Sequence, residues 1–305
     1  MESSGNVCPQ NGRSSTEKED GMTGTLYLCA TPIGNLEDIT LRVLRVLRES
    51  DVIAAEDTRN SIRLLNHFQI KTPMTSYHEY NKIDKAYQLV EQLKAGKNIA
   101  LITDAGTPGI SDPGEELVSI CYEEGIAVTA LPGACACIAA LTMSGQKTRR
   151  FAFEAFLPGD KKERAEVLKE MEKETRTLIV YEAPHRLCRT LHDLYETLGD
   201  RSVTVCRELT KKFEEKRKTT LLAAEEYYRK EAPRGEFVLV IEGKSRREIF
   251  REEAQAWEAI RIEDHVAKYE AQGLDRKAAM KAAAKDRGIS KRDVYAALLL
   301  AEENP

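Results

Sequence analysis

The sequence predicts an α/β protein of two domains followed by an all-α tail, and three observations support this fold class. Through the first half of the chain, short apolar runs typical of strands alternate with amphipathic segments typical of helices. The alternation breaks at Ser144–Arg150 and then resumes, and 305 residues suffice for two cores. Beyond about residue 250 the pattern is helical. We therefore predict domains at 24–145 and 151–244 and a helical module at 250–302.

Composition narrows the class of protein. Hydrophobic residues make up 42% and charged residues 31% of the chain, as in ordinary globular proteins. Because no run of about 18 apolar residues occurs, we expect nothing to span a membrane, and the pattern of cysteines favours a cytoplasmic location. The formal net charge of −4 means that nucleic-acid binding would need local basic patches. Seven cysteines without a CxxC pair favour reduced thiols over disulfides or a zinc site.

The first domain follows a polar leader. Residues 1–23 contain no apolar segment and no Arg-rich amphipathic pattern, which predicts disorder and no targeting signal. A strand at Thr25–Ala30 then runs into the loop Thr31–Asn35, and Asp38 or Thr40 can cap the next helix. The predicted apolar face of that helix contains Leu41, Val43, Leu44 and Leu47.

Further strands alternate with helices in this domain. The predicted strands lie at Asp51–Ala55, around Thr75–Asn81, at Ile99–Ile102 and at Ile126–Ala130. The predicted helices run from Thr58 to Leu65, through Leu89 to a stop at Gly96, over 115–124, and over Ala134–Ala140. Such alternation gives a parallel sheet, so the polar, Gly-rich and Pro-rich strand ends should meet at one edge of it.

The loop that follows Ile99–Ile102 is the strongest candidate for ligand binding. Residues 103–114 contain three glycines, two prolines and the acids Asp104 and Asp112. Glycine admits positive φ and a close approach of ligand to backbone, whereas proline fixes φ. The loop is more constrained than an ordinary βα turn requires, which is the alternative interpretation. Open α/β sheets bind their ligands at this end of a strand.

A second α/β domain and a tail complete the chain. The predicted strands are Phe151–Phe156, Arg176–Tyr181, Ser202–Cys206 and Phe237–Ile241. Helices are predicted near 160–174 and from Glu182–Arg186 onward. In the tail, three helices are predicted near 250–272, 276–286 and 290–302, with stops at Gly273 and Gly288 and an N-cap at Ser290.

Common catalytic motifs are missing from the sequence. No GxGxxG follows the first strand, and neither GxxxxGK[ST] nor HExxH nor GxSxG occurs. The five histidines lack metal-ligand spacing, so we expect no metal. The chemistry must therefore come from shaped loops at the sheet edge. Group transfer from a bound cosubstrate fits that description.

Two sets of motifs at the strand ends carry a family resemblance. The first domain contains Thr31–Asn35, Ala55–Arg59, Asp104–Pro108, Ser111–Gly114 and Leu131–Gly133. The second contains Phe156–Pro158, Tyr181–Arg186, Arg207–Lys211 and Gly235-Glu236. Together they resemble the tetrapyrrole-methylase superfamily, and in particular its bacterial members that methylate small-subunit ribosomal RNA. The resemblance covers about residues 24–302, including a tail similar to a helix-turn-helix module.

The resemblance implies an S-adenosylmethionine-dependent methyltransferase. Its substrate would be the ribose 2′-hydroxyl of a cytidine in the decoding region of 16S rRNA, either free or in the assembled 30S subunit. Members of the superfamily have two α/β domains with the cosubstrate in the cleft between them, and they are commonly homodimers. Methylation of a small tetrapyrrole or corrinoid precursor is the alternative, and a non-enzymatic RNA-binding module is a third reading.

The resemblance also implies site residues. The positions carried over for the cosubstrate are Pro32, Asp104, Gly106, Thr107, Pro108, Ala134, Cys135, Tyr181, Arg234 and Gly235. One departure is Cys135-Ala136-Cys137, where a proline or smaller residues would be expected. A thiol is small enough to leave the site intact.

A ribose hydroxyl is a poor nucleophile, so a base or hydrogen-bond acceptor would assist the transfer. Polar groups at the strand ends supply the catalytic candidates, and for each a purely structural role is the alternative. They are Glu56, Glu182, His185, Glu208 and Lys211.

Basic groups are the candidates for RNA contact. They are Lys147, Arg149 and Arg150; Lys161, Lys162 and Arg164; Lys211 and Lys212; Lys216, Arg217 and Lys218; and, in the tail, Arg276, Lys277, Lys281, Lys285, Arg287, Lys291 and Arg292. A charge run is usually a solvated face. The tail differs because these seven basic residues meet only Asp286 between 276 and 292, and phosphate binding needs such local density.

Overall fold

A computed structural model describes residues 23–303, so the leader predicted over 1–23 lies outside the described residues except for Thr23. The chain forms two compact units. The first unit contains the chain up to Pro32 together with Glu37–Ala134, and the second contains Ile33–Leu36 and the chain from Cys135 onward. None of the helices within 23–303 has the length and apolar character that crossing a bilayer requires.

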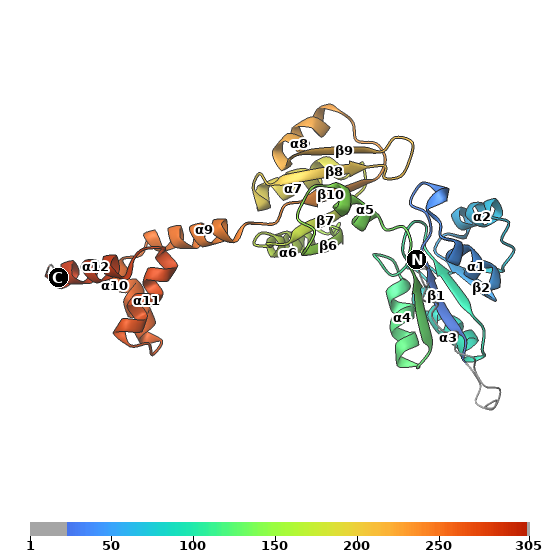
Figure 1. Cartoon of the computed structure of the whole chain (residues 1–305), viewed down its shortest axis with the longest axis horizontal. Coiled ribbons are helices and arrows are strands. Elements are labelled where there is room, and N and C mark those ends of the chain that lie inside the picture. The colour runs from blue at the N-terminus through green and yellow to red at the C-terminus, as the bar shows by residue number, and fades with distance from the viewer. Residues whose placement is uncertain (1–22, 304–305) are drawn as a thin grey trace, which may run out of the picture. The chain divides into compact units, whose positions relative to one another are not determined.

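The first unit is built on a five-stranded parallel sheet, called sheet 1 here (Figure 1). Its strands are β1 (Thr25–Cys29), β2 (Val52–Ala55), β3 (Met74–Ser76), β4 (Ile99–Ile102) and β5 (Ala127–Leu131). Their spatial order is β3-β2-β4-β1-β5, and every pairing is parallel. The predicted α/β class is confirmed. The carboxyl ends of all five strands lie at one edge, where the loops that follow them meet.

Helices cover both faces of sheet 1. They are α1 (Leu41–Glu49), α2 (Thr58–His67), α3 (Lys82–Lys94) and α4 (Gly114–Glu123), and a short 3₁₀ turn lies at Leu36–Asp38. The cores on the two faces take alternate residues of β4, Ile99 with α3 and α4, and Ala100 with α1 and α2. Thr40 caps α1 as predicted. The predicted apolar face was wrong at Leu41, which is 86% exposed, and Val46 is buried instead.

The second unit contains sheet 2, which is mixed (Figure 1). Its strands are β6 (Phe151–Phe156), β7 (Thr177–Glu182), β8 (Ser202–Arg207), β9 (Glu215–Thr220) and β10 (Phe237–Ile241). The order is β6-β7-β10-β8-β9, and only β6 and β7 are parallel. Strand β9 was not predicted, because its sequence EKRKTT contains no apolar residue. It pairs with β8 alone and forms an edge.

The helices of the second unit are α5 (Ala136–Met143), α6 (Lys161–Met171), α7 (Leu187–Leu198) and α8 (Leu221–Lys230). Helices α6, α7 and α8 bury one face of sheet 2, while α5 contacts β7 and β10. Helix α8 was not predicted. The predicted start of α5 at Ala134 was wrong, because Cys135 is still extended at φ −145° and serves as the N-cap.

The tail folds as four helices with a small core of its own. They are α9 (Arg246–Glu258), α10 (Ile262–Ala271), α11 (Arg276–Arg287) and α12 (Lys291–Glu303). The single helix predicted over 250–272 was wrong, since the helical hydrogen bonding stops near Ile260. Gly288 ends α11 with φ of 64°, and Ser290 accepts a bond from the Asp293 N–H at 3.1 Å, so both predicted boundaries are confirmed. Val266, Ala283 and Leu298 are among the core residues.

Candidate functional site

The loops that follow β1 and β4 are joined into one surface. Thr31 and Gly106 exchange two backbone hydrogen bonds, of 2.8 Å from the Thr31 N–H and 3.1 Å from the Gly106 N–H. The Thr31 hydroxyl also donates to the Thr103 carbonyl at 3.2 Å. Gly106 has φ of 88°, which a side chain would strain. Pro32 is buried beside this bridge, so the two predicted loops have a fixed relation to each other.

A third loop, which follows β5, is attached to the same surface. The Thr107 hydroxyl donates to the Ala134 carbonyl at 2.9 Å. Gly133 packs against Ala30 so closely that an added Cβ would lie 2.5 Å from the Ala30 Cβ. The structure therefore brings together five predicted cosubstrate residues of the first unit, namely Pro32, Gly106, Thr107, Pro108 and Ala134.

Asp112 stabilises the far part of the same loop. Its carboxylate accepts bonds from the backbone N–H groups of Gly109 at 2.8 Å, Ile110 at 3.1 Å and Gly114 at 2.8 Å. Burial raises the pKa of Asp112, although these hydrogen bonds act to lower it. Ser111 between them has φ of 68°. With its acceptor positions occupied by backbone donors, Asp112 holds the loop in shape and is not available to a ligand.

Three carboxylates crowd together at the carboxyl ends of β2 and β4. Glu56 accepts the Thr103 hydroxyl at 2.5 Å, and Asp104 accepts the Asp57 N–H at 3.2 Å. Hydrogen bonds from Arg59 lower the pKa of Asp57 to about 2. Burial, and after it the Glu56 charge, raises the pKa of Asp104. Within the described residues, neither Glu56 nor Asp104 forms an ion pair, so this edge of sheet 1 carries negative charge.

In the second unit, Glu182 lies in a buried network. Its side chain is fully buried, accepts the Thr190 hydroxyl at 2.5 Å, and lies 3.4 Å from the Arg186 guanidinium. Arg164 donates to Thr190 at 2.8 Å and to Asp193 at 2.7 Å. Every member of this network thus has a partner inside the unit, which is the arrangement of a structural anchor.

Tyr181, one residue before Glu182, meets the start of α5. Its hydroxyl accepts the Cys137 N–H at 2.8 Å, and its ring packs edge-on against Phe153 and Phe156. Burial and the neighbouring Cys137 thiol raise the pKa of Tyr181, so the phenol stays neutral. The Sγ atoms of Cys135 and Cys137 are 3.3 Å apart. The departure from the family pattern therefore places two thiols beside a predicted cosubstrate tyrosine.

Glu208 and Lys211 form an ion-paired cluster at the end of β8. The Lys211 ammonium donates to Glu208 at 2.9 Å and to Glu236 at 2.9 Å. Burial acts to raise the pKa of Glu208, but Lys211 and the Glu236 N–H outweigh it and hold that pKa below its usual range. Gly235 has φ of 84°, and a Cβ there would lie 2.5 Å from the Glu208 Cγ. Gly235 is thus required by the close approach of Glu208.

Two other predicted residues have no such anchoring. Arg234 and His185 are exposed, and within residues 23–303 neither side chain forms a hydrogen bond or ion pair. Sequence reasoning did not single out Glu236, Asp57 or Thr103 as site residues. Glu236 and Asp57 stand inside motifs that were recognised, so the motif itself could have indicated them, whereas Thr103 gave no such signal.

The tail presents most of its basic residues to solvent. Arg276, Lys277, Lys281, Lys285, Lys291 and Arg292 are exposed. Arg287 differs from the expectation, since its guanidinium donates to the buried His265 at 3.1 Å and to the Ile260 carbonyl. Arg164, also expected on a basic surface, is only 3% exposed. Both are structural residues.

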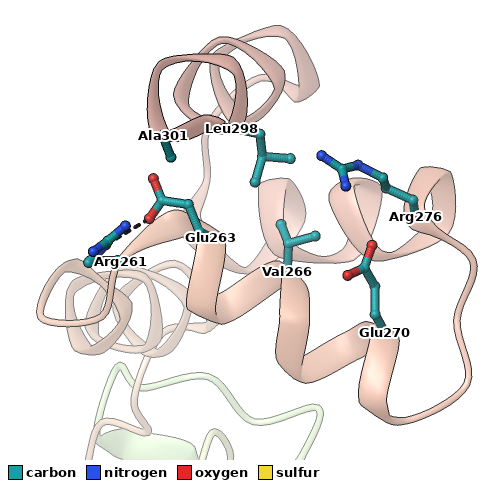
Figure 2. A pocket seen from close by; sticks show the side chains of 7 residues that line it. All are labelled: Arg261, Glu263, Val266, Glu270, Arg276, Leu298 and Ala301. Carbon is teal, nitrogen blue, oxygen red and sulfur yellow. Dashed lines mark hydrogen bonds and ion pairs between the residues drawn. The ribbon is translucent and has the colours of Figure 1, made fainter. Parts of the chain in front are cut away.

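A hollow of about 320 Å³ lies among α10, α11 and α12 of the tail (Figure 2). Val266 and Leu298 form its apolar part, and Arg261, Glu263, Glu270 and Arg276 surround it. Arg261 pairs with Glu263 at 3.1 Å. The hollow contains none of the strand-end residues described above. Among the described residues, no group of three or more His, Cys, Asp or Glu side chains is arranged to hold a metal ion.

Comparison with known proteins gives a consistent answer. Residues 25–225 match the family model described as Tetrapyrrole (Corrin/Porphyrin) Methylases. The chain is 50% identical over 272 residues to the Ribosomal RNA small subunit methyltransferase I of Halalkalibacterium halodurans, covering 89% of this chain and 93% of that protein. It is 47% identical to the protein of the same name from Bacillus subtilis, with the same coverage.

Solved structures agree with the family model on the fold. A diphthine synthase superposes with a TM-score of 0.60 at 14% identity, covering 73% of this chain and 91% of that one. The uroporphyrin III C-methyltransferase of Thermus thermophilus superposes with a TM-score of 0.53 at 18% identity, covering 72% and 97%. With strand-end loops of the predicted kind and a family match over most of its length, the chain belongs to the tetrapyrrole (corrin/porphyrin) methylase family.

Proposed function

We propose that this protein transfers the methyl group of S-adenosylmethionine to the ribose 2′-hydroxyl of a cytidine in the decoding region of 16S rRNA. The observation that carries the proposal is the 47–50% identity, over 89% of the chain, to proteins named ribosomal RNA small subunit methyltransferase I. The cytidine, the 2′ position and the decoding region rest on the family resemblance.

The residues of the first unit fit this cosubstrate. S-adenosylmethionine supplies a methyl group on a positively charged sulfonium, and it also carries an ammonium group. The unpaired carboxylates Glu56 and Asp104 give the edge of sheet 1 the complementary negative charge. Gly106, with its positive φ, permits a close approach to the backbone. We propose Asp104 as the acceptor for a cosubstrate donor. Tyr181, Arg234 and Gly235 remain proposed cosubstrate residues on the strength of the resemblance.

The contacts support a shorter set of candidates for the group that assists the 2′-hydroxyl. Glu182 is buried and fully partnered, and Lys211 is held as an ammonium between two carboxylates. Glu56, His185 and Glu208 remain. Glu208 is held ionised, so it is suited to accept a hydrogen bond and to orient the hydroxyl. Holding donor and acceptor at attack distance can supply roughly 7–11 kcal/mol, more than any single acceptor would.

The basic tail supports a polyanionic substrate. Six exposed cations between Arg276 and Arg292 offer phosphate contacts that a small macrocycle does not need. Methylation of a tetrapyrrole or corrinoid precursor is the second candidate function. It is favoured by the description of the family model and by the structural likeness to uroporphyrin III C-methyltransferase.

The test is a product analysis. The protein is incubated with labelled S-adenosylmethionine and, separately, with assembled small subunits, free 16S rRNA and a porphyrin precursor. Nuclease digestion followed by mass spectrometry should identify a 2′-O-methylcytidine. Label found only on bases, or only on the tetrapyrrole, would contradict the proposal.

A further inference from the structure

The loop between β8 and β9 has a fixed shape. Its backbone closes on itself through bonds from the Lys211 N–H to the Glu208 carbonyl at 3.0 Å and from the Glu214 N–H to the Lys211 carbonyl at 3.1 Å. The Glu214 carboxylate accepts the Thr210 N–H at 2.6 Å. Glu208 and Thr210 have φ of 51° and 63°, which residues other than glycine rarely adopt. Such strain persists only where surrounding contacts hold the loop, and it concentrates at functional sites.

This fixed loop presents an aromatic ring to solvent. The Phe213 side chain is 66% exposed, and the Lys212 ammonium lies 5.6 Å from the centre of its ring. A ring this exposed adds little to the core of the unit, so its face is available to a ligand. Aromatic rings on a basic surface are the platforms on which single-stranded nucleic acids stack their bases.

The acids and the lysines near this ring differ in whether they are bonded within the protein. Glu214 bonds the loop backbone, and Glu215 pairs with Arg207 at 3.5 Å and Arg217 at 3.1 Å. Arg217 itself lies over the Tyr227 ring at 3.8 Å.

In contrast, Lys212 and Lys216 are exposed and take part in no ion pair among the described residues, and Lys218 reaches only the Gly145 carbonyl at 3.5 Å. Lys216 and Lys218 alternate with Arg217, so they lie on one face of the edge strand β9, about 6.6 Å apart. Ion pairs neutralise Glu215, and the Glu214 carboxylate is held against the loop backbone, whereas three lysine ammonium groups face outward beside the ring.

We propose that Lys212, Phe213, Lys216 and Lys218, named here the β9 track, bind a single-stranded segment of RNA. Phe213 stacks on one base, and the lysines contact the phosphates beside it. The proposal rests on the proposed function, because it names how the same RNA substrate is held. Lysines on an edge strand also discourage pairing with other strands. That role does not account for an exposed phenyl ring on a strained, fixed loop.

The test uses the full chain and a fluorescent single-stranded RNA oligonucleotide, with affinity measured by anisotropy. Phe213→Ala should weaken binding by about 5- to 150-fold, the range that base stacking gives elsewhere. Phe213→Trp should restore it. The control is Tyr122→Ala, which removes a 72% exposed ring from α4 and should leave affinity unchanged. Equal affinity of wild type and Phe213→Ala would overturn the proposal.

The lysines are tested through salt dependence. Lys216→Ala with Lys218→Ala should reduce the slope of log affinity against log salt by about 1.4, since each phosphate contact to a single strand contributes about 0.7. Lys230→Ala on α8 is the control. If the double variant aggregates while the salt slope of RNA binding is unchanged, the two lysines serve to prevent pairing of the edge strand, and their part in the track is overturned.

Failure of the two proposals can be told apart. Cosubstrate affinity, measured by calorimetry, should be the same in all track variants. If wild type binds the oligonucleotide through Phe213 but does not methylate small-subunit RNA, the proposed function fails and the track stands. If wild type methylates the RNA and Phe213→Ala methylates it with the same KM, the track fails alone.

Discussion

Acidic side chains stand at the strand ends of both sheets, but the two sheets hold them in opposite ways. At the edge of sheet 1, the Glu56 charge raises the pKa of Asp104, and neither acid forms an ion pair among the described residues. At the ends of sheet 2, Glu182 lies beside Arg186, and Glu208 is bonded to Lys211. The raised pKa of Asp104 means that its charge disfavours the folded state, whereas the lowered pKa of Glu208 means that its charge favours the folded state.

We propose that this difference separates acids that bind a ligand from acids that stabilise the fold. An unpaired, crowded carboxylate is unfavourable for the folded state unless a cation binds there. A paired and buried carboxylate is favourable only while its partner remains. Removing an acid should therefore change ligand affinity in sheet 1 and the free energy of unfolding in sheet 2. Four predictions test this comparison, ordered from the largest expected effect.

The largest effect is expected for Glu182→Ala. The change leaves Thr190 and Arg186 without their buried acceptor, and breaking such a network costs about 3 kcal/mol of unfolding free energy. Urea unfolding followed by circular dichroism measures this loss. Methyl transfer by the protein that remains folded should be near normal, because Glu182 is assigned a structural role. A variant of full stability that has lost its activity would reverse the assignment.

The next effect is expected for Asp104→Ala. If Asp104 binds a cosubstrate donor, its removal should weaken S-adenosylmethionine by about 10- to 100-fold, as for a lost hydrogen bond to a charged group. Calorimetry measures the affinity. Asp104→Asn separates ligand from fold, because the amide oxygen can still accept the Asp57 N–H while the unfavourable charge is gone. Its melting temperature should not fall. Unchanged cosubstrate affinity in both variants would remove this loop from the site.

A smaller effect is expected when a single basic residue of the tail is replaced. Here the comparison is between an exposed basic residue and one that is bonded within the fold. Lys281 is exposed, whereas Arg287 is bonded to His265. Lys281→Ala should lower the salt slope of RNA binding by about 0.9 if it contacts a duplex phosphate, which is about fivefold in affinity near physiological salt. The control is Lys230→Ala. An altered oligomeric state with an unchanged slope would assign the tail to self-association instead.

The parts of the fold that the sequence predicted are those in which burial dictates the residue pattern. Ile99–Ile102 is buried on both faces, so its apolar run identified β4 residue by residue. Strand β9 lies at an edge and buries little, so EKRKTT gave no strand signal. The helix break near Ile260 contains neither glycine nor proline, so the sequence did not predict it. Leu41 was placed on a buried face by spacing alone, yet it begins its helix and is exposed.

The candidate site likewise has a part that the sequence could predict and a part that it could not. Parallel topology put the loops at Thr31 and Gly106 at one edge, which the sequence could predict. The partners of single side chains could not be predicted. Glu182 is bonded to Thr190, and Glu208 is packed on Gly235, through contacts that depend on helix placement and strand register. A motif indicates that an acid matters, whereas only the fold shows whether a cation neutralises it.

The smallest effect is a shift in pH dependence, and it tests the crowding at sheet 1 directly. Because burial and Glu56 raise the pKa of Asp104, its carboxylate takes up a proton at a higher pH than an ordinary aspartate as the solution is acidified. Cosubstrate affinity should therefore fall with decreasing pH through that raised pKa. Glu56→Gln removes the neighbouring charge, so the midpoint should move to lower pH.

The sign for folding is opposite to that for binding. The folded state holds the Asp104 proton more tightly than the unfolded chain does, so Asp104 should disfavour the folded state least at low pH and most above its folded pKa. Asp57 has a pKa of about 2 and stays ionised throughout, so its charge raises the pKa of Asp104 by the same amount in wild type and in Glu56→Gln, and the difference between the two midpoints reports on Glu56. Calorimetric titrations from pH 7 downward in wild type, Glu56→Gln and Asp104→Asn measure the shift. A midpoint that is the same in wild type and Glu56→Gln would show that the two carboxylates do not interact, and the contrast between the sheets would then rest on ion pairing alone.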